Sequence, residues 1–243
     1  MLFEELLEGE EVSIFALTDG TEALPLAPAQ DFKRLLDGDE GPNTGGMGSY
    51  SPVPFLDADE VAELVERVHR PVIAELARRG TPFVGLLYAG LMLTDDGPRV
   101  LEFNCRFGDP ETQAILPRLE GDFLGALAAA ASGALGDIEL AAGPEAAVTV
   151  VVAAPGYPDA PEHGIEIRGL DEAEATGALI FHAGTALRDG RLVSAGGRVL
   201  NVTGTGDSIA EARERAYAAV EGIDFPGGHF RRDIASRAVR VAG

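Results

Sequence analysis

Cysteine and long apolar runs are scarce in this sequence, and each scarcity excludes a class of protein. Cys105 is the only cysteine, which excludes an internal disulfide framework and a metal site built from several cysteines. No apolar run approaches the roughly 18 residues that a membrane helix needs, so we expect no membrane partner. Residues 1–11 lack the basic start and cleavage site of a signal peptide. Together these features predict a cytoplasmic protein.

Positive charge is scarce as well. The chain has 19 Lys and Arg against 40 Asp and Glu, a formal charge of −21 at pH 7. Nucleic acid usually binds a basic stripe, so we expect no nucleic-acid partner. The acidity is spread along the chain, which is typical of a solvated surface. Lys33 is the only lysine, so any role that requires a lysine falls to Lys33 or to another chain.

The first half of the chain alternates between strand and helix patterns. Hairpins are predicted around Asp19–Gly20 and around residues 95–97, each between apolar runs. A helix is predicted over residues 58–79, with Asp57 and Glu60 as a capping box and Gly80 as its stop. Pro71 should kink or divide this helix. A further helical region, residues 111–133, should be interrupted at Pro117 and end near Gly133.

The second half is richer in strands. Residues 146–153 form a continuous apolar run typical of a buried strand, and glycine-rich turns separate several more strands between residues 164 and 206. A helix that starts at Ser208, with Glu211 three residues later, should follow. The Gly-, Ala- and Pro-rich stretch 133–144 is the best candidate for a domain boundary.

Polar side chains alternate with apolar ones in VLEFNCR, residues 100–106. If this segment is a strand, its period of two places three polar residues on one face: Glu102, Asn104 and Arg106. The other face should point into the core, so Cys105 is expected to be a buried apolar residue rather than a nucleophile.

The chemistry of this polar face suits a metal–phosphate site. Glu102 and Asn104 offer one charged and one neutral oxygen donor, a set that suits Mg²⁺, which keeps waters and nucleotide phosphate oxygens as further ligands. Arg106 is placed to hold a phosphoryl group or a carboxylate. The alternative is an ordinary solvent-facing strand, since polar strand faces are common.

The glycine-rich segment GPNTGGMGSY, residues 41–50, is a second signal. Its glycines permit conformations in which successive backbone N–H groups converge on an anion, although the pattern is not a Walker A motif. A flexible surface loop is the alternative. Lys33 and Arg34, just upstream, are cations that could lie against a phosphate. With the strand at 100–106, the loop favours a Mg²⁺-dependent chemistry on an anionic substrate.

Longer motifs carry a resemblance to a known family. EELLEGEEVS (4–13), GPNTGGMGSYSPVP (41–54) and LEFNCRFGDPETQ (101–113) resemble the phosphoribosylamine–glycine ligases of purine biosynthesis, and the likeness continues through residues 184–220. The resemblance implies an α+β, ATP-grasp fold. It also implies a reaction in which ATP, glycine and 5-phosphoribosylamine give glycinamide ribonucleotide, ADP and phosphate through glycyl phosphate. The chain should then form the second ATP-grasp subdomain (1–135), followed by a small, mostly β C-terminal domain (140–243).

The resemblance also assigns roles to positions. Glu102 and Asn104 match the ligands of Mg²⁺ (or Mn²⁺) in the family. Glu4 and Leu7 match the hinge that holds the adenine of ATP, and Glu11 matches the residue towards the ribose. The substrate-binding set is expected to be Lys33, Asn43, Thr44, Gly45, Gly46, Met47 and Gly48.

Two further positions are inferred beside these. Arg106 and Asp109 are expected to contact a phosphate or carboxylate and the incoming amine, as the catalytic pair. Many ATP-grasp enzymes carry another acidic metal ligand on the neighbouring strand, but LLYAGLML, residues 86–93, contains no acid. That ligand is therefore absent here or comes from elsewhere.

The resemblance covers the later part of the family's chains. Family members begin with an N-terminal domain and a glycine-rich lid with a nucleotide-binding lysine, whereas this sequence starts at the hinge. It is interpreted as a C-terminal portion that works with an N-terminal half; a truncated gene, a mis-started gene and a separately encoded partner all remain open. The alternative is a non-catalytic ATP-grasp-derived binding module. A carboxylase-like ATP-grasp enzyme is disfavoured by RFGDPETQ (106–113).

Overall fold

The computed structural model describes residues 3 and 5–241, and the chain divides into two compact units. Unit 1 comprises the residues up to Gln30, Phe55–Gly108 and Leu119–Gly143; unit 2 comprises Asp31–Pro54, Asp109–Arg118 and the residues from Pro144 onwards. The units therefore interleave along the chain. The sequence predicted a linear division between residues 135 and 140, and that division stays a prediction about the family's domains.

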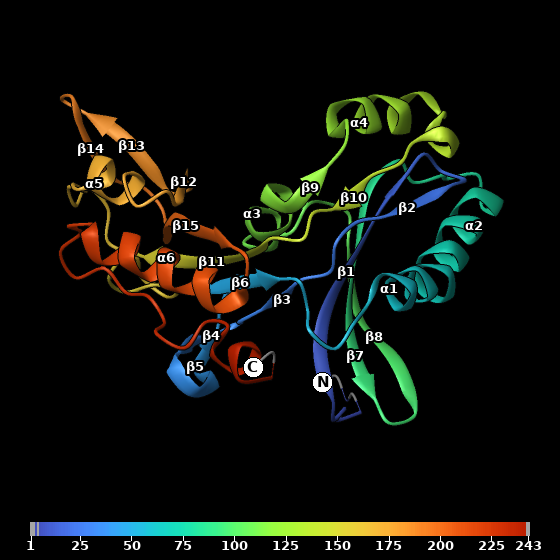
Figure 1. Cartoon of the computed structure of the whole chain (residues 1–243), viewed down its shortest axis with the longest axis horizontal. Helices are drawn as coiled ribbons and strands as arrows, with labels where there is room; N and C mark the ends of the chain where they lie inside the picture. Colours follow the sequence, from blue (N-terminus) through green and yellow to red (C-terminus); the bar gives the residue numbers. More distant parts are fainter. Residues whose placement is uncertain (1–2, 4, 242–243) are drawn as a thin grey trace. The chain divides into compact units, whose positions relative to one another are not determined.

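Unit 1 is built on a four-stranded antiparallel sheet in the order β2-β1-β7-β8 (Figure 1). Its strands are β1 (Glu10–Thr18), β2 (Ala23–Pro25), β7 (Gly85–Thr94) and β8 (Gly97–Asn104). Both predicted hairpins are confirmed. In the first turn the Asp19 carboxylate accepts the backbone N–H groups of Thr21 and Glu22. Burial raises the pKa of Asp19, but hydrogen bonds from the N–H groups of Glu22, Thr21 and Leu135 outweigh it and lower the pKa to about 2.

The predicted helix at residues 58–79 is one helical run with a wide turn in its middle. α1 (Ala58–Leu64) begins at the complete Asp57–Glu60 capping box, and α2 (Arg70–Arg78) ends just before Gly80. Between them Val65–His69 forms a π-helical turn, in which the N–H of Arg70 reaches back to the carbonyl of Val65. A proline ring clashes with the carbonyl four residues before it. The wide turn relieves this clash for Pro71, so the helix is not divided.

Helices cover the sheet of unit 1. The π-helical turn contacts β1, β2 and β7, and it buries His69, whose ring lies edge-on to Phe103 at a centroid distance of 6.4 Å. α4 (Phe123–Ser132) contacts β1 and β7, starting at the Asp122 cap and ending at the left-handed Gly133. α4 follows a short β9 (Leu119–Glu120), which pairs with β10 (Ala141–Ala142).

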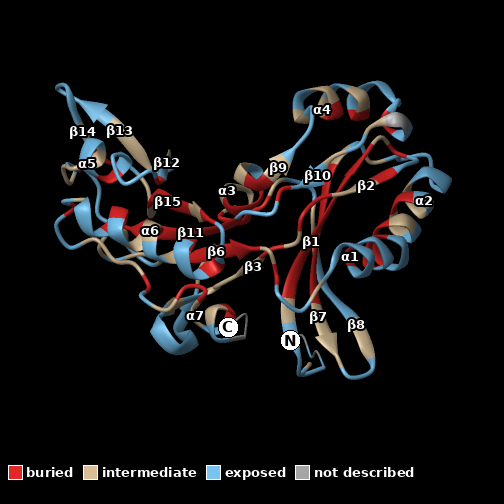
Figure 2. Cartoon of the chain, viewed as in Figure 1, coloured by how far each residue is buried: buried red, intermediate tan, exposed pale blue. Residues whose placement is uncertain are grey.

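Unit 2 is built on a five-stranded sheet in the order β12-β15-β11-β6-β3. Its strands are β3 (Gln30–Asp31), β6 (Gly48–Ser51), β11 (Ala146–Ala153), β12 (Leu179–His182) and β15 (Arg198–Gly206). β11 is buried along its whole length, as predicted, and lies in the middle of the sheet. Figure 2 shows the buried residues concentrated in β1 and β7 of unit 1 and in β11 and β15 of unit 2.

The two faces of this sheet differ in chemistry. α6 (Ile209–Gly222) covers one face, where its alanines pack on Val148, Val150 and Val202. Its N-terminal cap is the predicted Ser208, whose hydroxyl accepts the N–H of Glu211. The other face is polar and carries Ser49, Ser51, Thr149 and Thr203; it contacts α3 (Glu111–Ile115) and the 3₁₀ turn η3 (Leu116–Arg118).

The remaining elements of unit 2 are short. β4 (Arg34–Leu36) and β5 (Glu40–Asn43) form a hairpin around the 3₁₀ turn η1 (Asp37–Asp39), and β13 (Thr185–Arg188) pairs with β14 (Arg191–Ser194). Unit 2 also contains two short helices, α5 (Leu170–Glu174) and α7 (Ser236–Val241), and unit 1 contains the 3₁₀ turn η4 (Leu135–Asp137). The first of the strands predicted between residues 164 and 206 would lie at residues 164–170. That prediction is wrong, because Glu166 and Arg168 make isolated bridges there instead of a ladder.

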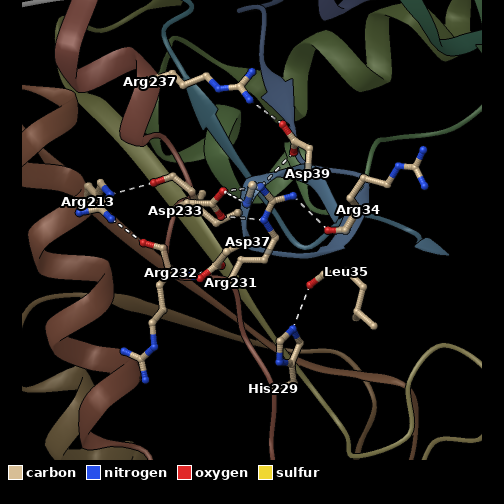
Figure 3. A network of polar contacts seen from close by, with 12 residues as sticks. Arg34, Leu35, Asp37, Asp39, Arg213, His229, Arg231, Arg232, Asp233 and Arg237 are labelled. Atoms are coloured by element: carbon tan, nitrogen blue, oxygen red, sulfur yellow. Dashed lines mark hydrogen bonds and ion pairs between the residues drawn. The ribbon is translucent and has the colours of Figure 1, made fainter. Parts of the chain in front are cut away.

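A buried arginine ties the β4–β5 hairpin to the C-terminal segment of unit 2. Arg231 is fully buried and donates to both carboxylate oxygens of Asp233 at 2.8 and 2.7 Å. It also lies 3.0 Å from Asp39 and donates to the carbonyl of Arg34 at 3.1 Å. Figure 3 shows these groups converging between the hairpin and the segment that follows His229. A buried guanidinium without such partners would be strongly destabilising.

No helix in the described part of the chain is long and apolar enough to cross a membrane.

Candidate functional site

The sheet of unit 1 carries Glu11 and the two predicted metal ligands on one face. Ser13 on β1 faces Gly90 on β7, and Gly90 faces Glu102 on β8, so these residues form one cross-strand row. Glu11 lies two residues from Ser13 and Asn104 lies two residues from Glu102, so both share that face. β1 and β8 are two strand spacings apart, roughly 9.5 Å. The face therefore carries the carboxylate of Glu11 on β1 and that of Glu102 on β8. The strand between them, β7, has Gly90 directly opposite Glu102, so no side chain of β7 projects from that position.

Glu102 and Asn104 touch each other as well as sharing a face. The Asn104 side-chain amide donates from Nδ2 to Oε1 of Glu102 at 3.1 Å. This bond uses the amide nitrogen, so the amide oxygen and the second carboxylate oxygen are available donor types for a hard cation. Glu102 is exposed and Asn104 is half-buried, so ligand can reach both.

The donor set fits a weakly held divalent cation. Within residues 3 and 5–241, no group of three or more His, Cys, Asp and Glu side chains is placed to hold a metal ion. The residue of β7 opposite Glu102 is Gly90, and β7 carries no acid, as the sequence indicated. A cation here would therefore have Glu102 and Asn104 as protein ligands and would take the rest from water and phosphate, the pattern that Mg²⁺ tolerates well.

The end of β8 departs from the prediction in two ways. A β-bulge shifts the register, so Gly90 faces Glu102 while Leu91 faces Val100, and Leu101 is the extra residue. Leu101 was expected in the core and is 41% exposed. β8 ends at Asn104, and Cys105, expected to be buried, is exposed. The prediction for both residues is wrong because β8 is an edge strand that bulges and then stops.

Arg106 consequently lies beyond the strand. Its side chain is exposed, and Nη1 donates to the carbonyl of Phe107 at 2.8 Å. Phe107 packs edge-on against Phe123 at a centroid distance of 6.1 Å, which anchors the segment that follows β8. The expectation that Arg106 continues the strand face of Asn104 is wrong, although its guanidinium remains accessible to a ligand.

The predicted hinge is only partly described. Glu4 lies outside the described residues. Leu7 is half-buried in the irregular segment before β1, and Glu11 is the second residue of β1. The side chain of Gln30 donates to the carbonyl of Glu11 at 2.8 Å, which fixes the backbone at the start of the strand. The roles of Glu4, Leu7 and Glu11 towards adenine and ribose stay predictions.

The glycine loop, Asn43–Gly48, belongs to unit 2, and its backbone is already hydrogen-bonded within the protein. The N–H of Thr44 donates to the carbonyl of Lys33 at 2.7 Å, and the N–H of Met47 donates to the carbonyl of Phe32 at 2.8 Å. The N–H groups of the two glycines between them go to side-chain hydroxyls: Gly45 to Tyr157 and Gly46 to Thr44, both at 3.0 Å. The predicted cradle of free N–H groups is therefore wrong for residues 44–47.

Glycine is required in this loop by close packing. Gly46 has a φ of +107°, and a Cβ there would lie 2.5 Å from Cδ of Pro110. In Gly48 a Cβ would lie 2.6 Å from the carbonyl oxygen of Thr149 on the neighbouring strand. Both glycines allow backbone segments to approach closely. The loop is thus a tightly packed turn rather than a flexible surface loop.

Asp109 also lies in unit 2, beside the glycine loop. Its carboxylate accepts a hydrogen bond from Gln113 Nε2 at 3.2 Å and lies 3.2 Å from Nη2 of Arg198. Both carboxylate oxygens are therefore engaged. The side chain of Asp109 is still 43% exposed, so a ligand can reach it, but as a paired anion rather than a free base.

Lys33 is half-buried and lies where β4 begins. Its carbonyl accepts both the N–H and the hydroxyl of Thr44, so the backbone of Lys33 is part of the loop's support. Arg34, the next residue, donates from Nη1 to the carbonyl of Gly41 at 2.7 Å. The structure thus brings Lys33, Thr44–Gly48 and Asp109 together within unit 2, and Glu11, Glu102 and Asn104 together within unit 1.

Comparisons with known proteins match residues of both units to one enzyme family. The model of the phosphoribosylglycinamide synthetase ATP-grasp (A) domain matches residues 1–112, and that of the C domain of the same enzyme matches residues 147–237. The phosphoribosylamine–glycine ligase of Streptomyces coelicolor is 57% identical over 98% of this chain. The chain belongs to the phosphoribosylglycinamide synthetase family.

The chain spans a little over half the length of several curated relatives of this family. The match covers 58% of the Streptomyces coelicolor ligase. The trifunctional purine biosynthetic protein adenosine-3 of Gallus gallus is 50% identical over 98% of the chain, which is 24% of that protein. The crystal structure of the ligase from Thermotoga maritima matches 96% of the chain and 57% of its own, with 43% identity and a TM-score of 0.86.

More distant structures share the fold alone. The Kluyveromyces lactis urea carboxylase matches 96% of the chain with a TM-score of 0.62 but only 13% identity. The hypothesis of a carboxylase-like enzyme was disfavoured by the RFGDPETQ motif. The similarity to this carboxylase is one of fold and not of sequence.

Two residues of the synthetase's C-domain match were missed by sequence reasoning. Arg198 and Tyr157 both bond directly to the glycine loop, although they lie more than 100 residues away from it in the chain. The signal was present but faint: Arg198 follows Gly196–Gly197 in a stretch that already resembled the family. A single sequence does not reveal which distant arginine meets which loop.

Proposed function

We propose that this chain is the part of a phosphoribosylamine–glycine ligase that holds the metal–nucleotide face and the substrate loop. The reaction would join glycine to 5-phosphoribosylamine with ATP, giving glycinamide ribonucleotide, ADP and phosphate. The observation that carries the proposal is the shared face of Glu11, Glu102 and Asn104 on the sheet of unit 1, in a chain of this family. The contact between this carboxylate and carboxamide, together with the family match, favours a cation-binding face over an ordinary solvent-facing strand.

The proposed chemistry proceeds in two transfers. The γ-phosphoryl group of ATP passes to the glycine carboxylate, which gives glycyl phosphate and ADP. The phosphoribosylamine nitrogen then attacks the carbonyl carbon, an amide bond forms, the C–O bond to phosphate breaks, and the amine loses a proton. A bound Mg²⁺ would offset negative charge on the phosphates. Mn²⁺ suits the same hard oxygen donors, so either cation fits this pair.

The residues of the chain divide these tasks. Glu102 and Asn104 would hold the cation, while Leu7, Glu11 and the undescribed Glu4 would face the adenosine. The glycine loop and Lys33 would face the substrates, with Arg106 and Asp109 nearest to the reacting groups. Since the loop's N–H groups at residues 44–47 are engaged, its contact with substrate would rest on Asn43, on carbonyl groups and on neighbouring side chains.

Partners and compartment follow from the same proposal. We propose the cytoplasm as the compartment, supported by the single, exposed cysteine. The division into residues 1–135 and 140–243 is retained as the proposed domain organisation. A second, separately supplied half of the ligase is proposed as the partner that completes the nucleotide site, because closure around the substrates excludes water in such reactions.

The test is ADP release from Mg²⁺–ATP with glycine and phosphoribosylamine. It is run on this chain alone and again after adding the part of the Streptomyces coelicolor ligase that lies outside the match. ADP release that requires both amine and glycine supports the proposal. Release only in the mixture would mean that this chain needs the added part of the ligase for activity. Absence of release in both, with a folded chain that still binds Mg²⁺–ATP, would favour the non-catalytic binding module.

A further inference from the structure

Arg198, the first residue of β15, makes a dense set of contacts to the glycine loop. Its Nη1 donates to the carbonyl of Gly45 at 2.7 Å and to the carbonyl of Asp109 at 2.6 Å, and it lies 3.4 Å from the carbonyl of Gly46. Its Nη2 lies 3.2 Å from the Asp109 carboxylate. The side chain is only 20% exposed. One guanidinium therefore joins two segments that are more than 60 residues apart in the chain.

The surrounding backbone is shaped to admit this guanidinium. A Cβ on Gly45 would lie 3.1 Å from Cζ of Arg198, so the loop is in contact with the guanidinium group itself. A Cβ on Gly197 would lie 2.5 Å from the ring of Tyr157, so glycine at this position lets the tyrosine approach. Tyr157 in turn accepts the N–H of Gly45. The loop is thus held on its carbonyl side by Arg198 and on its N–H side by Tyr157.

The chemistry of these contacts indicates support rather than ligand binding. Both terminal nitrogens of Arg198 are engaged with groups of the protein, and the charge is balanced by Asp109. A planar guanidinium with five donors can bridge separate carbonyls and a carboxylate at once, whereas a lysine offers one nitrogen. We propose that Arg198 is a positioning residue, which locks the glycine loop onto the Asp109–Pro110 turn and so sets the geometry of the substrate side of the proposed ligase.

This inference rests on the proposed function for its catalytic consequence and on geometry alone for the lock. The lock is tested by hydrogen exchange of the loop amides. In Arg198→Met and in Arg198→Lys the amides of Gly45 and Gly46 should exchange at least about tenfold faster, because their turn loses its anchor. The matched control is Arg191→Met, which removes an exposed arginine from β14 of the same unit; its loop exchange should equal that of the unmodified chain.

A milder variant guards against loss of the fold. Tyr157→Phe removes one hydroxyl, so exchange should rise at Gly45 and stay unchanged at Gly46, whose N–H goes to Thr44. Unchanged exchange at both glycines in a folded Arg198→Met or Arg198→Lys chain would overturn the lock. If both of these fail to unfold cooperatively, an unchanged Gly45 amide in Tyr157→Phe would overturn the two-sided arrangement.

The catalytic consequence is read from the mixture that releases ADP. Arg198→Lys should raise the KM for the amine or for glycine about tenfold while the KM for ATP stays unchanged, since the nucleotide residues lie in unit 1. Equal rises for all substrates, or none, would overturn the positioning role even if loop exchange increases. If the unmodified mixture releases no ADP, the proposed function has failed, and the exchange result still decides the lock.

Discussion

Asn104 donates its side-chain amide to the carboxylate of Glu102 across one strand repeat, at 3.1 Å. The contact orients both oxygen donors towards the same face of the sheet, so each side chain helps to place the other. Removing either side chain should therefore lower the affinity for a cation by more than the loss of one ligand alone would.

We expect Glu102→Ala and Asn104→Ala each to weaken Mg²⁺–nucleotide binding by at least about tenfold, the charged ligand more than the neutral one. Binding is measured by calorimetry with and without Mg²⁺. The control is Glu63→Ala, an exposed carboxylate on α1 that pairs with Arg67. Unchanged affinity in both site variants would remove Glu102 and Asn104 from the metal assignment.

The buried His69 should make unfolding depend on pH in a narrow window. Burial lowers the pKa of His69 to about 4 from 6.5, a shift that nearby backbone groups of Ile14 and Leu87 offset only in part. Neither ring nitrogen has a hydrogen-bond partner of normal geometry among the described residues. Below pH 6.5 the unfolded chain binds a proton that the folded chain does not. Stability should therefore fall between pH 6.5 and 4, by about 3 kcal/mol in total.

Denaturant unfolding at steps of pH checks this slope. His69→Phe should flatten it, whereas His182→Phe, which changes an exposed histidine bonded to Thr185, should leave it intact. Asp19 contributes little in this window, because the stability from its lowered pKa is lost mainly as the pH falls from the unfolded-state value of 3.8 to about 2. If the free energy of unfolding of His69→Phe still falls with falling pH over this range, groups other than His69 cause the pH dependence.

Arg231 should contribute far more to the free energy of unfolding than the adjacent Arg232. Arg231→Met leaves Asp39 and Asp233 without their shared partner, and we expect a loss of about 2–4 kcal/mol in the free energy of unfolding, moderated because both carboxylates are partly exposed. Arg232→Met removes the same charge from an exposed side chain and should cost less than about 0.5 kcal/mol. Equal losses in the two variants would mean that net charge, and not the buried pairing, stabilises this segment.

Local signals in the sequence predicted much of this fold. The Asp57–Glu60 capping box, the two hairpins, the buried β11 and the helix that starts at Ser208 depend on residues within a few positions of each other, and all are confirmed. Cys105 and Leu101 were placed wrongly because a bulge and a strand end depend on the partner strand. The loop at residues 43–48 was recognised as special for the wrong reason: its glycines serve close packing.

The tertiary part of the candidate site was the least predictable. Glu102 and Asn104 could be paired from the period of a strand, but the face that also holds Glu11 depends on the register of three strands. Arg198 and Tyr157 reach the glycine loop from distant segments. No local pattern marks such contacts, because an arginine after two glycines is compatible with many turns.

Gly46 offers a direct test of close packing against backbone conformation. Gly46→Ala places a methyl group 2.5 Å from Cδ of Pro110 and forces a φ of +107° on an L-residue, so we expect a loss of about 2–4 kcal/mol in the free energy of unfolding. Gly97→Ala is the matched control: its φ is +103°, close to that of Gly46, but the nearest atom lies 3.7 Å from the new carbon, so it should cost about 1–2 kcal/mol. Because the two positions share their backbone conformation, thermal and denaturant unfolding of the two variants isolates the packing contribution. If Gly46→Ala costs no more than Gly97→Ala, the loop yields to the methyl group, and the glycines serve conformation alone. A larger cost at Gly46, with faster exchange of the loop amides, would tie the loop's shape to its contact with the Asp109–Pro110 turn.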